Sequence, residues 1–254
     1  MRNPSAVREK ETNLCDNLKF TAAEAYKLLR TNLMFTIPSD KQCRIIGISS
    51  ALPGEGKSVT SINLSYTIAE TGKKVLLIDA DMRLPNIARQ LELEVSPGLS
   101  NVLAGLNNDE EIRVKSSKLD NWDIVTAGDI PPNPSELLGS EQMAAFLKKV
   151  SADYDFIIID LPPINVVTDA LTILEQVDGI IVVVRQNYAS RQALKSCMRQ
   201  LELNKEKLLG FVMTAAKESV KSYGKYGKYG KYGKYQKYGH SYEMAKEQQS
   251  KNSK

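Results

Sequence analysis

The chain has 254 residues, 42% of them hydrophobic and 25% charged, with a formal net charge of +4. This length and composition favour one soluble α/β domain with a well-developed core. The single histidine, His240, lies near the C-terminus, which excludes Ser-His-Asp hydrolysis and histidine-based zinc sites from residues 1–216. Cys15, Cys43 and Cys197 lack metal-ligand spacing and are interpreted as free thiols.

Neither a membrane span nor a secretory signal is predicted. The first residues carry charges without an apolar run, and no segment approaches the roughly 18 consecutive apolar residues of a membrane helix. Three regions are expected instead: a polar arm over 1–20, a folded domain over 21–216 and a tail over 217–254.

Apolar runs alternate with helical patterns through the folded domain. A helix is expected over 22–35 with Thr21 as its N-cap, and further helices over 57–71, 141–152 and 190–203. Strands are expected at 44–49, 74–79, 123–126, 155–160, 179–184 and 208–214. Continuous apolar strands separated by helices predict a doubly wound, mostly parallel sheet with helices on both faces. Ligands of such sheets bind at the carboxyl ends of the strands.

A phosphate loop follows the first strand. The residues from Ala51 to Ser58 read Ala-Leu-Pro-Gly-Glu-Gly-Lys-Ser and open a helix, which is the context that a P-loop requires. Backbone N–H groups of the loop bind phosphate at the positive end of that helix. Lys57 is expected to reach the β and γ phosphates of ATP, and the Ser58 hydroxyl to bind Mg²⁺; a strand-to-helix turn with chance Gly and Lys is the alternative. The predicted nucleotide contacts are Pro53, Gly54, Glu55, Gly56, Lys57, Ser58 and Val59.

Two further strands end in acidic residues. Asp79 and Asp81 close the second strand, and Asp160 closes the strand over 155–160. In a parallel sheet these ends lie beside the phosphate loop, where hard carboxylate oxygens suit Mg²⁺. The metal ligands are therefore predicted to be Ser58, Asp79, Asp81 and Asp160. One acid can instead act as a base, for which Asp79 is the candidate; the alternative for each acid is a helix cap.

Between Tyr223 and Tyr238 the tail carries a tyrosine at every third position, and Tyr242 follows. Its ten Lys and three Glu give a net charge of 10 − 3 = +7, so residues 1–216 carry 4 − 7 = −3. A period of three fits neither helix nor strand, and recurrent Gly loosens the backbone, so the tail is expected to be disordered and exposed. An ATP site followed by exposed phenols predicts an enzyme that phosphorylates itself. The expected acceptors are Tyr223, Tyr226, Tyr229, Tyr232, Tyr235, Tyr238 and Tyr242.

These motifs resemble those of the bacterial tyrosine kinases. The phosphate loop, residues 75–83 and residues 156–163 are similar to the Walker A, A′ and B motifs of that family, and residues 24–30, residues 131–138 and the tyrosine tail extend the resemblance over nearly the whole chain. The family's members are P-loop enzymes found in capsular and exopolysaccharide loci, and the free-standing cytoplasmic form is typical of Gram-positive bacteria. The resemblance implies an Mg²⁺- and ATP-dependent tyrosine autokinase, with Lys57, Asp79, Asp81 and Asp160 as catalytic residues.

The same resemblance implies partners. A separate transmembrane activator, which takes part in polysaccharide polymerisation and export, would recruit the kinase to the inner face of the membrane. A cognate phosphotyrosine phosphatase is expected, and nucleic acid is not. The family's oligomerisation motif, Glu-x2-Arg-x2-Arg, reads Glu24, Lys27, Arg30 here. These residues lie on one helical face and predict a ring-shaped homo-oligomer, although Lys27 lacks the bidentate fork of an arginine.

Two other classes of function remain open from the residues alone. The first is an ATP-driven positioning or scaffold switch without kinase activity. Positioning ATPases carry a signature lysine where this chain has Leu52, which argues against that branch. The second is a nucleic-acid or acidic-lipid binder, because Lys and stacking Tyr suit single strands. The ATP site favours the kinase over both.

Overall fold

The computed structural model describes residues 14–37, 41–203 and 208–216. The expected tail and all its tyrosines therefore lie outside the described residues, as does most of the expected arm. The strands are β1 Arg44–Ser50, β2 Val75–Asp79, β3 Arg113–Lys115, β4 Trp122–Val125, β5 Phe156–Asp160, β6 Gly179–Arg185 and β7 Leu208–Thr214. The helices are η1 Cys15–Asn17, α1 Phe20–Thr36, α2 Lys57–Ala69, α3 Ile87–Leu91, α4 Leu99–Leu103, α5 Pro134–Leu138, α6 Glu141–Val150, α7 Asp169–Thr172, η2 Leu174–Gln176 and α8 Arg191–Leu203.

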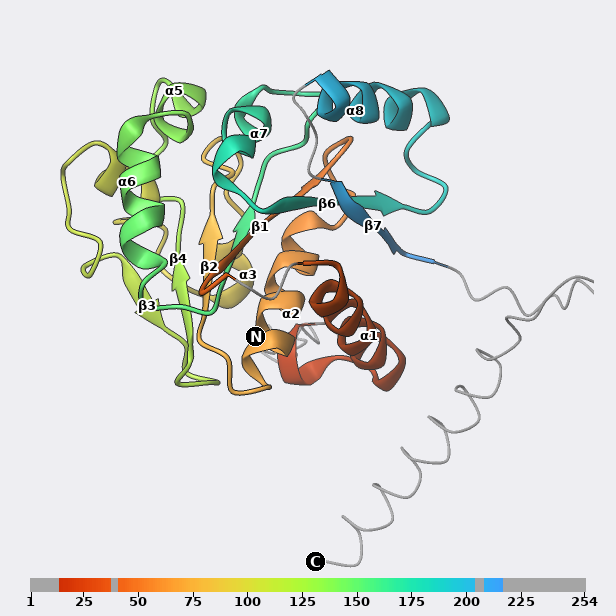
Figure 1. Cartoon of the computed structure of the whole chain (residues 1–254), viewed down its shortest axis with the longest axis horizontal. Coiled ribbons are helices and arrows are strands. Elements are labelled where there is room, and N and C mark those ends of the chain that lie inside the picture. Colours follow the sequence, from red (N-terminus) through yellow and green to blue (C-terminus); the bar gives the residue numbers. More distant parts are fainter. Residues whose placement is uncertain (1–13, 38–40, 204–207, 217–254) are drawn as a thin grey trace, which may run out of the picture.

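The strands form one sheet in the order β3-β4-β2-β5-β1-β6-β7 (Figure 1). All neighbouring pairs are parallel except β3 with β4, so the predicted mostly parallel, doubly wound sheet is confirmed. The order places β1 beside β5, and β5 beside β2. The carboxyl ends of these three strands therefore lie next to one another at one edge of the sheet.

Each face of the sheet has its own apolar core. Residues alternate along each strand, so that Ile46 and Ile158 pack with α1, α2 and α3 on one face. Ile78 and Ile159 pack with α4, α5, α6, α7 and α8 on the other. Burial on both faces explains why the central strands are apolar without interruption. None of the helices within the described ranges is long and apolar enough to cross a membrane.

The start of α1 corrects the predicted N-cap. The helix begins at Phe20 with Lys19 as its N-cap, so Thr21 lies in the first turn and the prediction that it caps the helix is wrong. Tertiary packing fixes this end instead of a capping side chain. Leu14 and Cys15 are buried against the same core as α2, and the Cys15 N–H donates to Asn63 Oδ1 at 2.7 Å. The last part of the expected polar arm is thus partly core.

Most of the other predicted elements begin and end within about two residues of the observed bounds, which is the usual uncertainty of helix ends. The antiparallel strand β3 and the short helices α3, α4, α5 and α7 were not predicted. Each spans five residues or fewer, too short to display a periodic apolar pattern.

A matched pair of leucine substitutions tests the position of the core. Leu77→Ala in β2 removes a fully buried side chain and should lower the free energy of unfolding by about 2–5 kcal/mol. Leu106→Ala removes a side chain that is 72% exposed and should change it by about 0.5 kcal/mol or less. Denaturant titration followed by fluorescence of Trp122, the sole tryptophan, measures both. Equal effects would contradict this placement of the core.

Candidate active site

The phosphate loop connects β1 to the N-terminus of α2. Gly54 and Gly56 have φ values of 78° and 93°, a left-handed conformation that residues with a Cβ rarely adopt. Gly56 is the N-cap of α2, and its carbonyl accepts the Thr60 N–H at 3.0 Å. The loop thus ends at the positive end of a 13-residue helix, a favourable position for an anion.

The four predicted catalytic side chains are brought together at this edge. Asp79 and Asp160 are directly paired in the register of β2 and β5. The Lys57 ammonium lies 2.8 Å from Asp81 Oδ2 and 3.5 Å from Asp160 Oδ2. All four residues are buried. A single cation therefore faces three carboxyl groups, a local excess of negative charge that a divalent cation would neutralise.

The Asp79 carboxyl group also caps the N-terminus of α3. A helix cap was the alternative that the sequence left open to a chemical role for this residue. One of its oxygens accepts the N–H groups of Asn86 and Ile87, at 3.1 and 3.0 Å, at the start of α3. The other accepts the Asp81 N–H at 3.2 Å. These backbone bonds fix the carboxyl group at the carboxyl end of β2.

Asp160 is oriented by a residue that the sequence analysis did not select. The Ser61 hydroxyl donates to Asp160 Oδ1 at 2.9 Å, and the same hydroxyl lies 3.0 Å from the Lys57 carbonyl. Ser61 follows Lys57 by one helical turn, so the i, i+4 spacing was the signal that could have identified it. Asp160 Oδ2 stays directed toward Lys57.

Burial and mutual repulsion shift the pKa values of these groups. Burial raises the pKa of Asp79 to about 7, with the charge of Asp160 adding to the rise and the bonds from Ile87 and Asn86 opposing it. Burial also raises the pKa of Asp160, against the attraction of Lys57. For Lys57, burial lowers the pKa, but the charges of Asp160 and Asp81 outweigh it and raise the pKa to about 12. The lysine therefore stays protonated at neutral pH.

Arg83, beyond the end of β2, joins the acidic segment to two helices. Its Nε and Nη2 lie 2.8 and 3.1 Å from the two carboxylate oxygens of Asp169, a bidentate pair in which the carboxylate is fully buried. Ser135 on α5 also donates to Asp169 on α7. Burial raises the pKa of Asp169, but the bonds from Arg83 and Ser135 outweigh it and lower the pKa below its usual value. The segment is thereby anchored to α5 and α7.

The predicted oligomerisation residues lie on α1. Lys27 Nζ pairs with Glu24 Oε1 at 2.8 Å, and both side chains are close to half exposed. Arg30 Nη1 donates to the Thr67 carbonyl near the end of α2, at 2.5 Å. Arg30 is thus engaged within its own chain, while Glu24 and Lys27 remain accessible to a neighbour.

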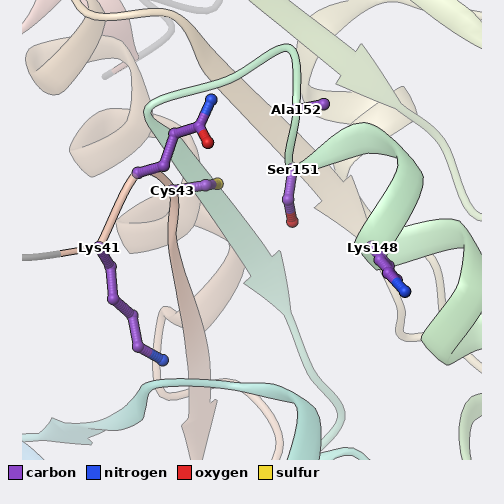
Figure 2. Close-up of a pocket in the computed structure, with 6 residues that line it drawn as sticks. Lys41, Cys43, Lys148, Ser151 and Ala152 are labelled. Atoms are coloured by element: carbon purple, nitrogen blue, oxygen red, sulfur yellow. The ribbon is translucent and has the colours of Figure 1, made fainter.

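A hollow of about 340 Å³ lies at the opposite end of the sheet, between the start of β1 and the end of α6. Figure 2 shows Cys43 and Ser151 in this hollow, with Lys41 and Lys148 at its sides. Burial raises the pKa of the Cys43 thiol to about 11, so it stays protonated at neutral pH and is a poor nucleophile. The hollow is therefore not part of the acidic site.

Comparisons with known proteins agree with the geometry. A family model described as an AAA domain matches residues 43–211. Over 203 residues the chain is 40% identical to tyrosine-protein kinase YwqD of Bacillus subtilis (strain 168), covering 80% of this chain and 85% of the relative. The chain belongs to the bacterial tyrosine kinases. It is a protein-tyrosine kinase with a P-loop nucleotide site, and it also belongs to the AAA-domain family.

Solved structures share the fold of this kinase. The kinase domain of Escherichia coli tyrosine kinase ETK matches with a TM-score of 0.77 and 29% identity, covering 88% of this chain and 89% of that one. The chimerical protein CapA2B2 matches with a TM-score of 0.71 and 34% identity, covering 75% and 83%. The septum site-determining protein MinD of Pyrococcus horikoshii, complexed with Mg-ADP, matches with a TM-score of 0.53 and 26% identity, covering 67% and 70%.

The raised pKa of Asp79 predicts how the stability of the kinase without nucleotide and magnesium depends on pH. An acid with a pKa of about 7 when folded and 3.8 when unfolded binds its proton more tightly in the folded state. Its stabilising effect is complete below the unfolded value and is lost as pH rises through about 7, a loss of up to about 3 kcal/mol between pH 5 and 8. Asp79→Asn removes this titration, so the stability of the variant relative to the wild type should rise between these two pH values.

The difference between the two chains is the quantity to measure, because other groups titrate in both. Thermal melts in a chelator at about pH 5 and about pH 8 provide it. The lost acceptor oxygen of the variant shifts its stability equally at both pH values and cancels. A difference that does not change with pH would contradict the raised pKa.

Proposed function

We propose that this kinase transfers the γ-phosphoryl group of ATP to the tyrosines between residues 217 and 254, its own tail. The observation that carries the proposal is the site in which Lys57 faces three buried carboxyl groups beside a phosphate loop. A second observation supports the tail as substrate. β7 is parallel to β6 and ends at Thr214, whose hydroxyl donates to the Glu55 carbonyl of the phosphate loop. The last described strand, which precedes the tail in the sequence, therefore ends beside the phosphate loop.

The donor set fits Mg²⁺ together with ATP. Within 14–37, 41–203 and 208–216, no three Asp, Glu, His or Cys side chains form a ready-made metal cage. Mg²⁺ commonly takes one or two carboxylates and completes its shell with phosphates and waters, which suits the Ser58 hydroxyl with Asp81 and Asp160. Bound there, the metal would neutralise phosphate charge. The Lys57 ammonium would stabilise the charge on the transferred group.

Asp79 is proposed to orient the tyrosine hydroxyl and to accept its proton. A phenol has a pKa near 10 and is protonated at neutral pH, while a loose phosphoryl-transfer transition state needs only weak help from a base. A carboxyl group with a pKa of about 7 suits general-base catalysis near neutral pH. Its three backbone bonds hold it in place for this role.

We further propose that the kinase acts in polysaccharide polymerisation and export with a transmembrane activator, a ring of its own copies and a cognate phosphatase. Similarity to named tyrosine-protein kinases over most of the chain supports this assignment. The accessible Glu24 and Lys27 on α1 are compatible with contacts between copies. Recruitment to the membrane would depend on the activator.

The catalytic lysine provides the first test. Lys57→Met removes the cation at the phosphates and should lower tail phosphorylation by about 100-fold or more. The control is Lys73→Met, the same substitution at a half-exposed lysine after α2, which should retain the wild-type rate. Mass spectrometry after incubation with Mg-ATP, with and without an activator peptide, locates the phosphate. ATP hydrolysis with an unmodified tail in the wild type would favour a positioning ATPase instead.

Transfer between subunits can be tested by isotope labelling. The tail has 38 residues, and a flexible chain of that length has an r.m.s. span of about 31–37 Å, enough to reach a neighbouring site. Isotope-labelled Lys57→Met chains, which lack activity, are mixed with unlabelled wild-type chains. We expect phosphate on the labelled tails. Because the sites of the labelled chains are inactive, this phosphate would have to come from another subunit. Phosphate confined to the unlabelled chains would show transfer within one subunit.

Phosphorylation should also weaken the oligomer. Seven phosphotyrosines at about −1.5 to −2 each add roughly −10 to −14 to a tail whose charge is +7, so its sign reverses. Neighbouring tails would then repel one another, and the body of net charge −3 would repel them as well. Light scattering before and after full phosphorylation is expected to show a smaller assembly. An unchanged mass would contradict this effect.

A further inference from the structure

Two segments at the carboxyl edge of the sheet carry the proposed magnesium ligands. Asp81 lies in the segment that follows β2, and Asp160 ends β5, where the connection to α7 begins. Their Oδ2 atoms lie 2.8 and 3.5 Å from the same Lys57 ammonium, so the two carboxyl groups approach one point from different parts of the chain. The spacing between the two segments therefore sets the spacing between the two carboxyl groups.

A buried ion pair joins these two segments. Arg83 follows Asp81 by two residues, and Asp169 is the first residue of α7, at the far end of the connection that starts after Asp160. The guanidinium of Arg83 binds both carboxylate oxygens of Asp169, at 2.8 and 3.1 Å. Asp169 is fully buried, and Ser135 on α5 donates to it as well. We call the pair of Arg83 and Asp169 the acid-segment bridge.

The backbone next to the bridge is tied closely to Asp81. The Leu84 N–H donates to Asp81 Oδ1 at 3.1 Å, so Asp81 and Arg83 lie within one hydrogen-bonded turn. Met82, between them, is buried in the same apolar core as α7 and holds the turn at one point. Leu84 is 73% exposed and adds little packing, so the bridge from Arg83 supplies a second point of attachment. A shift of the Arg83 side chain is therefore passed to the carboxyl group of Asp81.

We propose that the acid-segment bridge positions Asp81 and Asp160 for Mg²⁺. This inference rests on the proposed function, in which these two acids help to hold the metal. Mg²⁺ requires near-ideal octahedral geometry with ligand distances of about 2.0–2.1 Å, so it tolerates little change in the spacing of its ligands. Residues that orient metal ligands without touching the metal typically contribute about 10- to 100-fold to its affinity. Arg83 and Asp169 are positioning residues of this kind.

The alternative is an ion pair that serves only the stability of the fold, and the two roles differ in their effect on nucleotide binding. Loss of a positioning residue weakens ADP binding only when Mg²⁺ is present, because the phosphate loop stays intact. Loss of a purely structural pair weakens ADP binding equally with and without Mg²⁺, or leaves both unchanged. The ratio of the dissociation constant without Mg²⁺ to that with Mg²⁺ measures the coupling between metal and nucleotide.

Substitutions on both sides of the bridge test it with little risk to folding. Asp169→Asn keeps the shape of the side chain and removes its charge; the Arg83 side chain is 43% exposed, so water can solvate the freed guanidinium. Arg83→Lys keeps the positive charge and loses the bidentate fork. The matched controls are Asp109→Asn and Arg113→Lys. These two residues form a second ion pair at 2.6 Å, in which Asp109 is also buried.

The control pair lies away from the acids. Arg113 also pairs with Asp153, which precedes the start of β5 and so lies at the opposite end of that strand from Asp160. Its loss should affect the stability of the fold without reaching the magnesium ligands.

Calorimetric titration of each full-length chain with ADP, once with excess Mg²⁺ and once with a chelator, gives both dissociation constants. We expect Asp169→Asn and Arg83→Lys to lower their ratio by about tenfold and to leave the constant in chelator within about twofold. Asp109→Asn and Arg113→Lys should keep the wild-type ratio. Tail phosphorylation by the bridge variants should need more Mg²⁺ and should recover as Mg²⁺ is raised, because excess metal compensates for a lower affinity.

A wild-type ratio in the bridge variants would overturn the inference, and so would an equal loss of ADP affinity with and without Mg²⁺. Thermal melts of the same samples identify any variant that is not folded, in which case the substitution on the other side of the bridge decides. A wild type whose ADP binding does not depend on Mg²⁺ would refute the metal assignment and this inference with it. A wild-type tail that acquires no phosphate would refute the proposed transfer alone, because ADP binding is measured independently.

Discussion

Three buried carboxyl groups share one buried ammonium, and the rest of the site depends on this imbalance. Asp79, Asp81 and Asp160 face Lys57 at the carboxyl edge of the sheet, where burial would make each uncompensated charge costly. Backbone N–H groups at the start of α3 and the hydroxyl of Ser61 supply part of the compensation. What remains is a negative potential that an anionic nucleotide meets favourably only with a divalent cation. On the proposed function, this charge balance suits a nucleotide that binds together with Mg²⁺.

The topology of the sheet makes this concentration of charge possible. Only a parallel arrangement brings the carboxyl ends of β1, β2 and β5 to the same edge, with β5 between the other two. Helices cover both faces, so the strands are held by two apolar cores and their ends cannot shift independently. Apolar packing away from the site therefore offsets the free-energy cost of burying like charges. A rigid scaffold of this kind keeps catalytic groups in place before the substrate arrives.

Sequence patterns predicted the elements with a regular apolar pattern and the loop whose backbone conformation requires glycine. The central strands were predictable because burial on both faces leaves only apolar residues, and the phosphate loop because its glycines are required by φ. Side-chain direction was not predictable: Glu55 turns into the protein, and Asp79 combines a helix-capping position with its place in the site. Thr21 was a plausible cap, but packing of Cys15 and its neighbours fixed the start of α1 elsewhere. Short-range patterns are overridden where long-range contacts decide.

The division of charge along the chain connects the site to its proposed substrate. Residues 1–216 carry a net −3 and residues 217–254 a net +7, with a lysine beside most of the tail tyrosines. A cationic segment is drawn toward an edge rich in carboxyl groups, and this attraction acts alike on the four repeats that begin at Tyr223, Tyr226, Tyr229 and Tyr232, because each reads Tyr-Gly-Lys. Each phosphate added reverses part of that charge, so a modified repeat is repelled from the site that modified it. On the proposed function, product release and the move to the next tyrosine therefore have the same electrostatic origin.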